Sequence, residues 1–229
     1  MALGRDVRLA RILGNPRRRV LTVAVDHLIN YPVGLPEGLR DMTPTLAGIV
    51  AGGADAVTMN KGIAMRYMAP HAGQIPLIVQ SMALRPGEPD FADHATAEEV
   101  LAMGAEAIAV SIFVHCRQEV TFARHLSAVV RAAEPLGLPV IPHIYPLSSG
   151  DEGSTVAHDA EHVYYAARMG MEMGADVVKV PFTGDAASFR DIVRQTAVPV
   201  VAAGGPRCDN IEQAAEMLQA VARSGAAGA

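Results

Sequence analysis

A lysine interrupts an apolar run in the segment ADVVKVPFTGD, residues 175–185. Burying an isolated ammonium group costs several kcal/mol, so Lys179 is neutral, paired with a carboxylate, or present for chemistry. A neutral lysine can attack a carbonyl group to form a Schiff base, which lets an adjacent C–C bond break or form. A structural ion pair between Lys179 and Asp26 would account for the same position.

The sequence contains one other lysine, Lys61, because 17 of its 19 basic residues are arginines. Lys61 follows an apolar run in the segment MNKGI, where solvent reaches it more easily than it reaches Lys179. It is the competing nucleophile, but we expect it to contact a substrate or a carboxylate instead.

Three further side chains at the ends of apolar runs could move the protons that Schiff-base chemistry requires. Asp26 ends the run VLTVAVD, and His143 and Tyr145 end the run PVIPHIY. A carboxylate together with a phenol or an imidazole can transfer protons near neutral pH. We therefore expect Asp26, His143 and Tyr145 to meet at the same mouth of the fold as Lys179.

The segment AAGGP suggests a binding site for an anionic group. Backbone N–H groups at Gly204 and Gly205 could face a phosphate, although paired glycines after a strand also occur in tight turns. Arg85 and Arg207 are candidates for binding a second anionic group. His158 and His162 have the spacing of a zinc-binding pair, but we interpret them as part of a solvated helix face and expect no metal.

Two types of sequence pattern alternate along the chain, and the strands and helices that they predict must position these residues. Seven short apolar runs are separated by amphipathic stretches such as EVTFARHLSAVVRAAEPLG, as expected of parallel strands joined by helices. The predicted strands cover residues 20–26, 56–60, 76–81, 107–114, 139–145, 177–182 and 199–205.

Polar residues follow nearly every predicted strand, and this distribution favours a TIM (β/α)8 barrel over a doubly wound sheet. A barrel gathers functional residues from many strand ends, whereas a doubly wound sheet concentrates them at one switch point. The eighth βα unit is missing from the residues given, because the chain stops at SGAAGA. We therefore expect the natural protein to continue past Ala229.

Length and composition indicate one α/β domain over residues 1–229, with an N-terminal helix at about 3–14 and the barrel from about residue 20. The net charge of −5 provides no basic surface for nucleic acid, and no apolar run reaches the ~20 residues that span a bilayer. The charged N-terminal segment lacks the pattern of a secretory signal, so we expect a cytoplasmic protein without membrane or nucleic-acid partners. Cys116 and Cys208 are expected to be reduced thiols.

The segments GADVVKVPFTGD and VPVVAAGGP resemble the Schiff-base strand and phosphate loop of the archaeal-type class I fructose-bisphosphate aldolases. VDH at residues 25–27 and HIYP at residues 143–146 resemble two further motifs of that family, so the similarity runs from about residue 20 to residue 205. The wider group includes tagatose-bisphosphate and deoxyribose-phosphate aldolases and aminodideoxyheptulosonate synthases.

The resemblance implies a metal-independent lyase without a cofactor, acting on a phosphorylated ketose or a related keto compound. It implies that Lys179 is the Schiff-base nucleophile, that Tyr145 is the general acid/base, and that Asp26 binds substrate and supports carbinolamine chemistry. It also implies that Gly204 and Gly205 hold a phosphate, that His27 contacts the substrate, and that the protein forms a homo-oligomer.

Two departures from the family pattern leave other functions open. His143 replaces a tryptophan and could be either a different substrate contact or a second proton-transfer group. Leu147 replaces an arginine that would bind a far phosphate. The alternatives are a transaldolase-type synthase or a thiolase on the same scaffold, and a barrel that binds sugar phosphates without catalysis.

Overall fold

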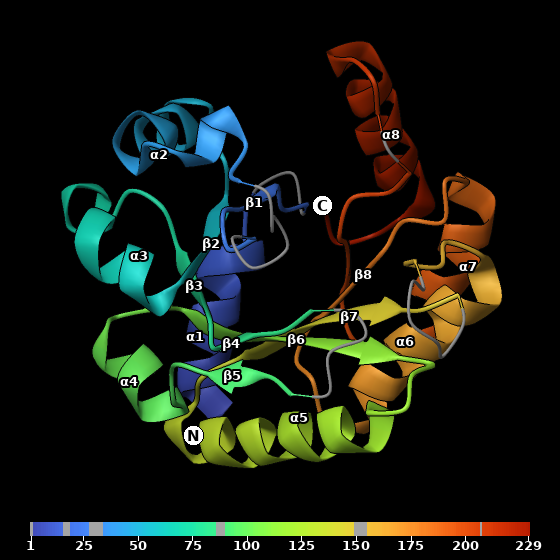
Figure 1. The fold of residues 1–229 in the computed structure, drawn as a ribbon, viewed down its shortest axis with the longest axis horizontal. Helices are drawn as coiled ribbons and strands as arrows, with labels where there is room; N and C mark the ends of the chain where they lie inside the picture. Colours follow the sequence, from blue (N-terminus) through green and yellow to red (C-terminus); the bar gives the residue numbers. More distant parts are fainter. Residues whose placement is uncertain (1, 16–18, 28–33, 86–89, 149–154, 207) are drawn as a thin grey trace.

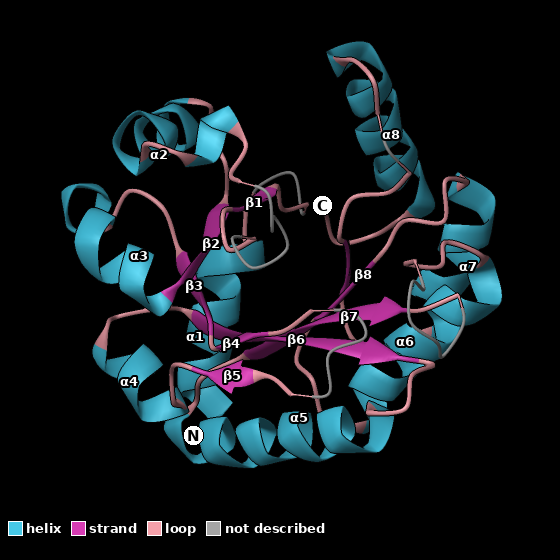
Figure 2. Cartoon of the chain, in the orientation of Figure 1, coloured by secondary structure: helices cyan, strands magenta, loops and turns pink. Residues whose placement is uncertain are grey.

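A computed structural model describes residues 2–15, 19–27, 34–85, 90–148, 155–206 and 208–229 of the protein. Seven parallel strands form a curled sheet in the order β1-β2-β3-β6-β7-β8-β9, with helices on its outer side (Figures 1 and 2). The parallel strands are β1 (Thr22–Ala24), β2 (Ala56–Asn60), β3 (Leu77–Gln80), β6 (Ala107–Val114), β7 (Val140–Pro146), β8 (Val178–Val180) and β9 (Val200–Ala202).

Eight α-helices and three short 3-10 helices accompany the strands in the described part of the chain. Five α-helices begin directly after an Asp, Thr or Asn whose side chain accepts a backbone hydrogen bond from the first turn. The α-helices are α1 (Ala2–Leu13), α2 (Met42–Ala51), α3 (Lys61–Tyr67), α4 (Ala97–Ala102), α5 (Glu119–Ala133), α6 (Ala160–Glu172), α7 (Ala186–Gln195) and α8 (Ile211–Ser224), and the 3-10 helices are η2 (Glu37–Leu39), η3 (Ala69–His71) and η4 (Glu134–Leu136).

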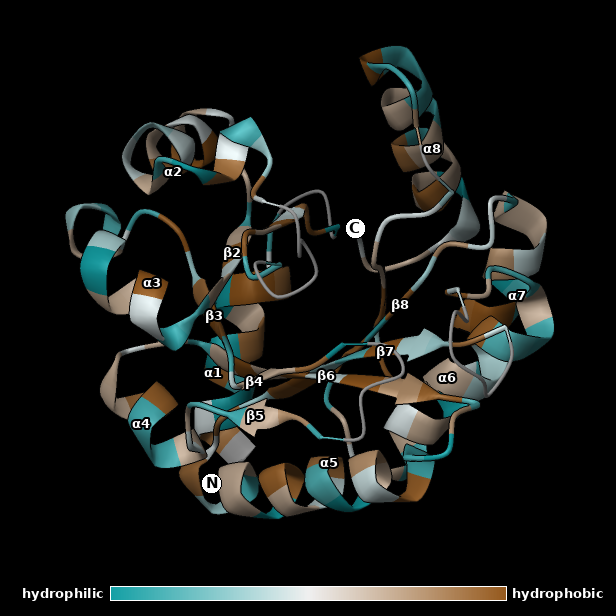
Figure 3. Cartoon of the chain, in the orientation of Figure 1, coloured by the Kyte–Doolittle hydropathy of each residue, from teal (hydrophilic) through white to brown (hydrophobic). Residues whose placement is uncertain are grey.

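The sheet is buried on both faces, which explains why its strands read as continuous apolar runs. Hydrophobic residues concentrate along the strands, whereas the helices alternate hydrophobic and hydrophilic residues (Figure 3). Inside the curl, Ile12 of α1 packs with a cluster that includes Val20, Ile78 and Val201. Helix α1 therefore covers the end of the barrel where the strands begin.

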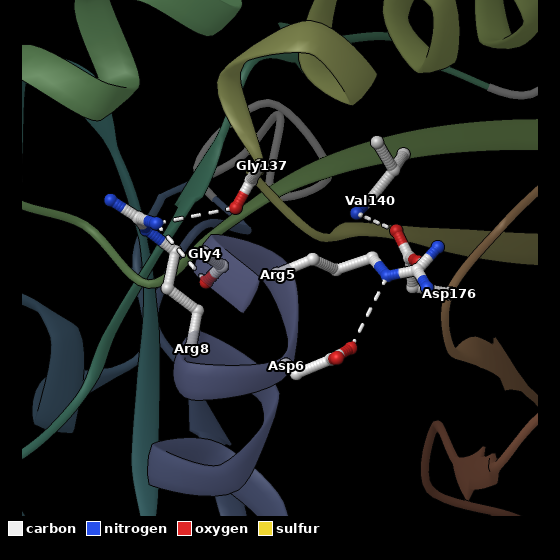
Figure 4. A network of polar contacts seen from close by, with 7 residues as sticks. All are labelled: Gly4, Arg5, Asp6, Arg8, Gly137, Val140 and Asp176. Carbon is white, nitrogen blue, oxygen red and sulfur yellow. Dashed lines mark hydrogen bonds and ion pairs between the residues drawn. The ribbon is translucent and has the colours of Figure 1, made fainter. Parts of the chain in front are cut away.

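Two arginines of α1 fasten this helix to the loops that precede β7 and β8 (Figure 4). Arg8 donates to the carbonyl oxygen of Gly137 at 3.2 Å, and Arg5 pairs with Asp176 at 3.4 Å. Asp176 also accepts a hydrogen bond from the backbone N–H of Val140 at 2.9 Å. The end of the barrel opposite the strand C-termini is thus closed by packing and by charge.

The eighth βα unit is incomplete, as the sequence indicates, but the last residues of the chain partly fill the space between the two edges of the sheet. Gly228 forms parallel bridges with both Val20 and Val201. Ala227 donates to the carbonyl oxygen of Val200 at 2.8 Å and accepts from the N–H of Val20 at 2.8 Å. The last residues therefore connect the two edges of the seven-stranded sheet where its strands begin.

A second, antiparallel sheet of two strands was not predicted. It joins β4 (Met82–Ala83) to β5 (Ala92–Asp93), and strands of two residues are too short to produce a periodic pattern. Among the described residues, no helix combines the length and the apolar character needed to cross a membrane.

Candidate active site

Lys179 lies in the middle of β8, beside His143 of β7 and Val201 of β9. Its residue is only 8% exposed, and it makes no side-chain hydrogen bond or ion pair with any other residue that the structure describes. Burial lowers the pKa of the Lys179 amine, and the negative charge of Asp26 opposes this effect only in part. The geometry favours a neutral amine over a structural ion pair.

His143 and Tyr145 lie two residues apart on β7, so both side chains are on the same face of the sheet. Burial holds the pKa of His143 well below its ordinary value, and Lys179 and His27 lower it further whenever they carry a positive charge. Burial and the negative charge of Asp26 raise the pKa of the Tyr145 phenol above its usual range. Near neutral pH the imidazole is therefore uncharged and the phenol keeps its proton.

Asp26 follows the end of β1 and is held by amide side chains from two neighbouring strands. Gln80 of β3 donates from Nε2 to the Asp26 carboxylate at 3.1 Å, and Asn60 of β2 donates from Nδ2 to the Asp26 backbone carbonyl at 3.2 Å. The same Gln80 nitrogen donates to the Ser111 hydroxyl at 2.6 Å, and His27 Nδ1 lies 3.7 Å from the Asp26 carboxylate. Four strands thus contribute to the placement of one carboxyl group.

These residues line two hollows of the barrel, which we call the outer and the inner hollow. Asp26, His27, Gln80, Ser111 and Tyr145 line the outer one together with Phe113 and β4. Lys179 and His143 line the inner one together with Thr22, Thr58 and apolar residues that include Ile12 of α1. A larger hollow, of about 580 Å³, lies at the other end of the barrel around Arg5 and Asp176, and no predicted site residue lines it.

The glycine loop after β9 lies beside the end of β8. The carbonyl oxygen of Gly204 accepts a hydrogen bond from the N–H of Phe182 at 2.8 Å, and the Gly204 φ of 75° is a conformation that favours glycine. A Cβ at Gly205 would lie 2.9 Å from the Met217 sulfur of α8. The backbone conformation of Gly204 and the close packing at Gly205 thus account for both glycines without a bound phosphate. Arg207 lies outside the described residues.

Three further residues that the sequence singled out are bound by other protein groups: Lys61, His158 and His162. Lys61, the first residue of α3, forms an ion pair at 2.6 Å with Glu99 of α4, in agreement with the expected carboxylate contact and not with a substrate contact. His158 precedes α6 instead of lying within it and bonds to the carbonyl oxygen of Phe182 at 3.0 Å, whereas His162 pairs with Asp159 at 2.8 Å. The two histidines are therefore engaged by different protein groups.

Sequence reasoning assigned no role to Gln80, Asn60 or Ser111. Gln80 and Asn60 were visible as polar residues at strand ends, but nothing in the sequence indicated that they contact Asp26. Ser111 was visible as the one polar residue within the run AIAVSIFV. A polar side chain within a buried strand was the signal that could have identified it.

Comparison with known proteins relates the chain to lysine-dependent aldolases. The model of the family described as DeoC/LacD family aldolase matches residues 20–229. The chain is 36% identical to 2-amino-3,7-dideoxy-D-threo-hept-6-ulosonate synthase of Halobacterium salinarum, over 88% of this chain and 74% of that protein. It is 32% identical to the class 1 fructose-bisphosphate aldolase of Thermoproteus tenax, over 93% of this chain and 81% of that protein.

Solved structures agree with the sequence comparisons. An archaeal fructose-1,6-bisphosphate aldolase whose catalytic lysine is covalently bound to the carbinolamine intermediate of the substrate has a TM-score of 0.83 and 27% identity, covering 98% of this chain and 89% of that one. A Schiff-base-forming fructose-1,6-bisphosphate aldolase has a TM-score of 0.82 and 28% identity, covering 98% and 90%.

Proposed function

Because the chain belongs to the DeoC/LacD family of aldolases, a family of Schiff-base lyases, we propose that Lys179 is its Schiff-base nucleophile. The proposed reaction is the aldol cleavage or formation of a C–C bond in a phosphorylated ketose or a related keto compound. The observation that carries this proposal is the buried, unpaired amine of Lys179, beside His143 and within the electrostatic influence of Asp26.

The first step of the proposed reaction is attack of the Lys179 amine on the substrate carbonyl carbon. The C–N bond forms as the carbonyl π bond breaks, and as the nitrogen loses a proton the oxygen takes one up, which gives a neutral carbinolamine. The hydroxyl group then takes up a further proton and leaves as water, and the nitrogen lone pair forms the C=N bond of a protonated Schiff base. Asp26 is suited to this stage because it lines the outer hollow and its negative charge acts on the Lys179 amine, and we assign it to proton transfer and to binding substrate hydroxyl groups.

The second step is cleavage of the neighbouring C–C bond. A substrate hydroxyl loses its proton, an aldehyde leaves, and the electron pair of the broken bond moves into the Schiff base to give an enamine. We assign the proton transfers of this step to Tyr145 together with His143: the uncharged imidazole takes the hydroxyl proton, and the protonated phenol donates a proton to the enamine carbon. The uncharged His143 is placed to accept or return a proton beside the lysine.

We assign the phosphate of the substrate to the loop at Gly204 and Gly205, with His27 as a further substrate contact. The relatives named as fructose-bisphosphate aldolases support a phosphorylated substrate, and the loop lies beside the end of the lysine strand. Lys61 is omitted from this set, because Glu99 already binds its ammonium group. A cytoplasmic location and a homo-oligomeric state remain predictions from the sequence.

A second candidate function is a transaldol transfer that builds a heptulosonate-like product. The 36% identity to the synthase from Halobacterium salinarum, above the 32% to the aldolase from Thermoproteus tenax, favours keeping this alternative. Both reactions proceed through the same lysine adduct. A panel of acceptor aldehydes, tested against the protein loaded with a ketose phosphate, would separate a transferase from a simple aldolase.

The test of the lysine chemistry is borohydride trapping with fructose 1,6-bisphosphate or dihydroxyacetone phosphate, read by intact mass. The wild-type protein and Lys61→Met should both gain one reduced adduct, and Lys179→Met should gain none. The two substitutions are matched, since each removes one of the two lysine amines in the chain. An adduct that persists in Lys179→Met, or none in the wild type, would refute the proposal.

A further inference from the structure

The Asp26 carboxyl group is placed by side chains and not by its own strand. Strand β1 ends at Ala24, and one more backbone hydrogen bond follows it, from the N–H of Val25 to the carbonyl oxygen of Thr58, at 2.9 Å. Beyond that point Asn60 holds the Asp26 backbone carbonyl, and Gln80 holds the carboxylate. The direction of the carboxylate therefore depends on Gln80 more than on β1.

Gln80 is fixed strongly enough to serve as such a support. Its residue is 2% exposed, lies within the β3 ladder, and has its backbone carbonyl bonded to His94 Nε2 at 2.7 Å. Its side-chain Nε2 serves both the Asp26 carboxylate and the Ser111 hydroxyl. A carboxylate only accepts hydrogen bonds, so the Asp26 contact identifies the amide end that faces it as the NH2 end.

The Oε1 end of the Gln80 amide does not explain why a glutamine occupies this position. Gln80 Oε1 is buried and has no hydrogen-bond partner among the described residues. Leaving a buried acceptor without a donor costs about 1–3 kcal/mol, so a glutamine here is a poor choice for stability alone. Its two donated bonds, both directed to residues that line the outer hollow, are what this side chain contributes.

We propose that Gln80 is a positioning residue of the aldolase reaction, which holds the Asp26 carboxylate in its reactive direction and acts on the reaction only through Asp26. The proposal rests on the role assigned above to Asp26 and Lys179. It predicts that removing the Gln80 amide slows formation of the lysine adduct when Asp26 is present, and has no further effect when Asp26 is absent.

A double-mutant cycle tests this coupling. The rate of borohydride trapping with dihydroxyacetone phosphate would be measured in wild type, Gln80→Leu, Asp26→Ala and the double variant. Gln80→Leu alone should slow trapping about 10- to 100-fold, because a misplacement of about 1 Å costs rates of this order. The double variant should trap no more slowly than Asp26→Ala. Equal slowing in both backgrounds, or no slowing in either, would overturn the proposal.

Two further variants separate positioning from folding. Ser81 follows Gln80 in the chain, and its buried hydroxyl donates to the carbonyl oxygen of Ala109. The substitution Ser81→Ala removes this hydroxyl and should leave the trapping rate unchanged. Gln80→Glu keeps the shape of the side chain but can donate to Asp26 only when protonated, so its rate relative to wild type should rise as the pH falls. A ratio that stays constant with pH would count against the proposal.

Failure of this inference can be distinguished from failure of the lysine assignment. If the wild type forms an adduct that disappears in Lys179→Met, the Schiff base stands and the cycle tests Gln80 alone. If the wild type forms no adduct, the assignment of Lys179 fails first.

Discussion

Lys179 lies in a position that favours reactivity at the expense of stability. Its amine is removed from water in the centre of a strand, and among the described residues no ion-pair partner compensates for the lost hydration. Residues that depart from the rules of stable packing are expected where a protein does chemistry. For Lys179 this expectation leads to a stability measurement that is independent of any substrate.

We predict that Lys179→Met stabilises the protein near neutral pH, by about 0.5–2 kcal/mol in the free energy of unfolding. Burial lowers the pKa of this lysine in the folded state, whereas the unfolded chain has the ordinary value of about 10.4. The unfolded state therefore binds more protons below that pH, and the wild-type protein gains stability as the pH rises toward 10.4.

The stabilisation by methionine should accordingly be largest in mildly acidic solution and should shrink as the pH approaches 10. Urea unfolding of both proteins at pH 6 and pH 9.5 would measure the difference. A wild-type protein that is more stable than Lys179→Met at pH 6 would contradict the account of a desolvated, unpaired amine.

The sequence alone identified Lys179, Asp26, His143 and Tyr145, because each stands at or near the end of an apolar run. It did not reveal that Gln80 contacts Asp26, since that contact depends on how β1, β2 and β3 are staggered around the barrel. Lys61 could not be placed either. Its partner Glu99 is 38 residues away, in the first turn of α4, and only the fold brings the starts of α3 and α4 within reach of each other.

At the scale of elements, close contact between α6 and the sheet fixes the two strands that bear Lys179, His143 and Tyr145. Gly170, in the last turn of α6, lies directly over β7 and β8. A Cβ there would lie 2.7 Å from Ile144 Cδ1 and 2.8 Å from Val178 Cγ1. The absence of a side chain lets the helix approach these strands.

We predict opposite effects for the same substitution in two helices. Gly170→Ala should lower the free energy of unfolding by about 1–3 kcal/mol, because overpacking against Val178 outweighs the gain in helix propensity. Gly48→Ala in α2 should raise it by about 0.5–1 kcal/mol, because a Cβ there meets nothing within 4 Å. Thermal or urea unfolding would measure both, and equal signs would contradict the packing described for α6.

The predicted strands were located correctly, but several were too long. The run at residues 20–26 becomes β1 at Thr22–Ala24, and the run at residues 177–182 becomes β8 at Val178–Val180. An apolar run shows which residues are buried, whereas a strand ends where the regular ladder of backbone hydrogen bonds with its neighbouring strands ends. Asp26 and Phe182 lie beyond such ends, in the segments that form the mouth of the barrel.

At the scale of the whole molecule, the barrel separates a reactive end from a structural end. Helix α1 covers the start of the strands with Ile12, and its arginines bind at Gly137 and Asp176, whereas Asp26, Gln80 and Tyr145 line a hollow at the opposite end. The alternation of strands and helices predicted this architecture. The sequence did not predict that residues 227–229 bridge both sheet edges, because three small residues carry no strand pattern.

The most direct test of the central claim is to locate the trapped adduct in the wild-type chain. Reduced with borohydride in the presence of dihydroxyacetone phosphate, modified Lys179 should resist trypsin, so the adduct mass should appear on one uncleaved peptide spanning residues 169–190. The account predicts this peptide and an unmodified Lys61. Adduct mass on the peptide spanning residues 41–66, or on neither peptide, would contradict it.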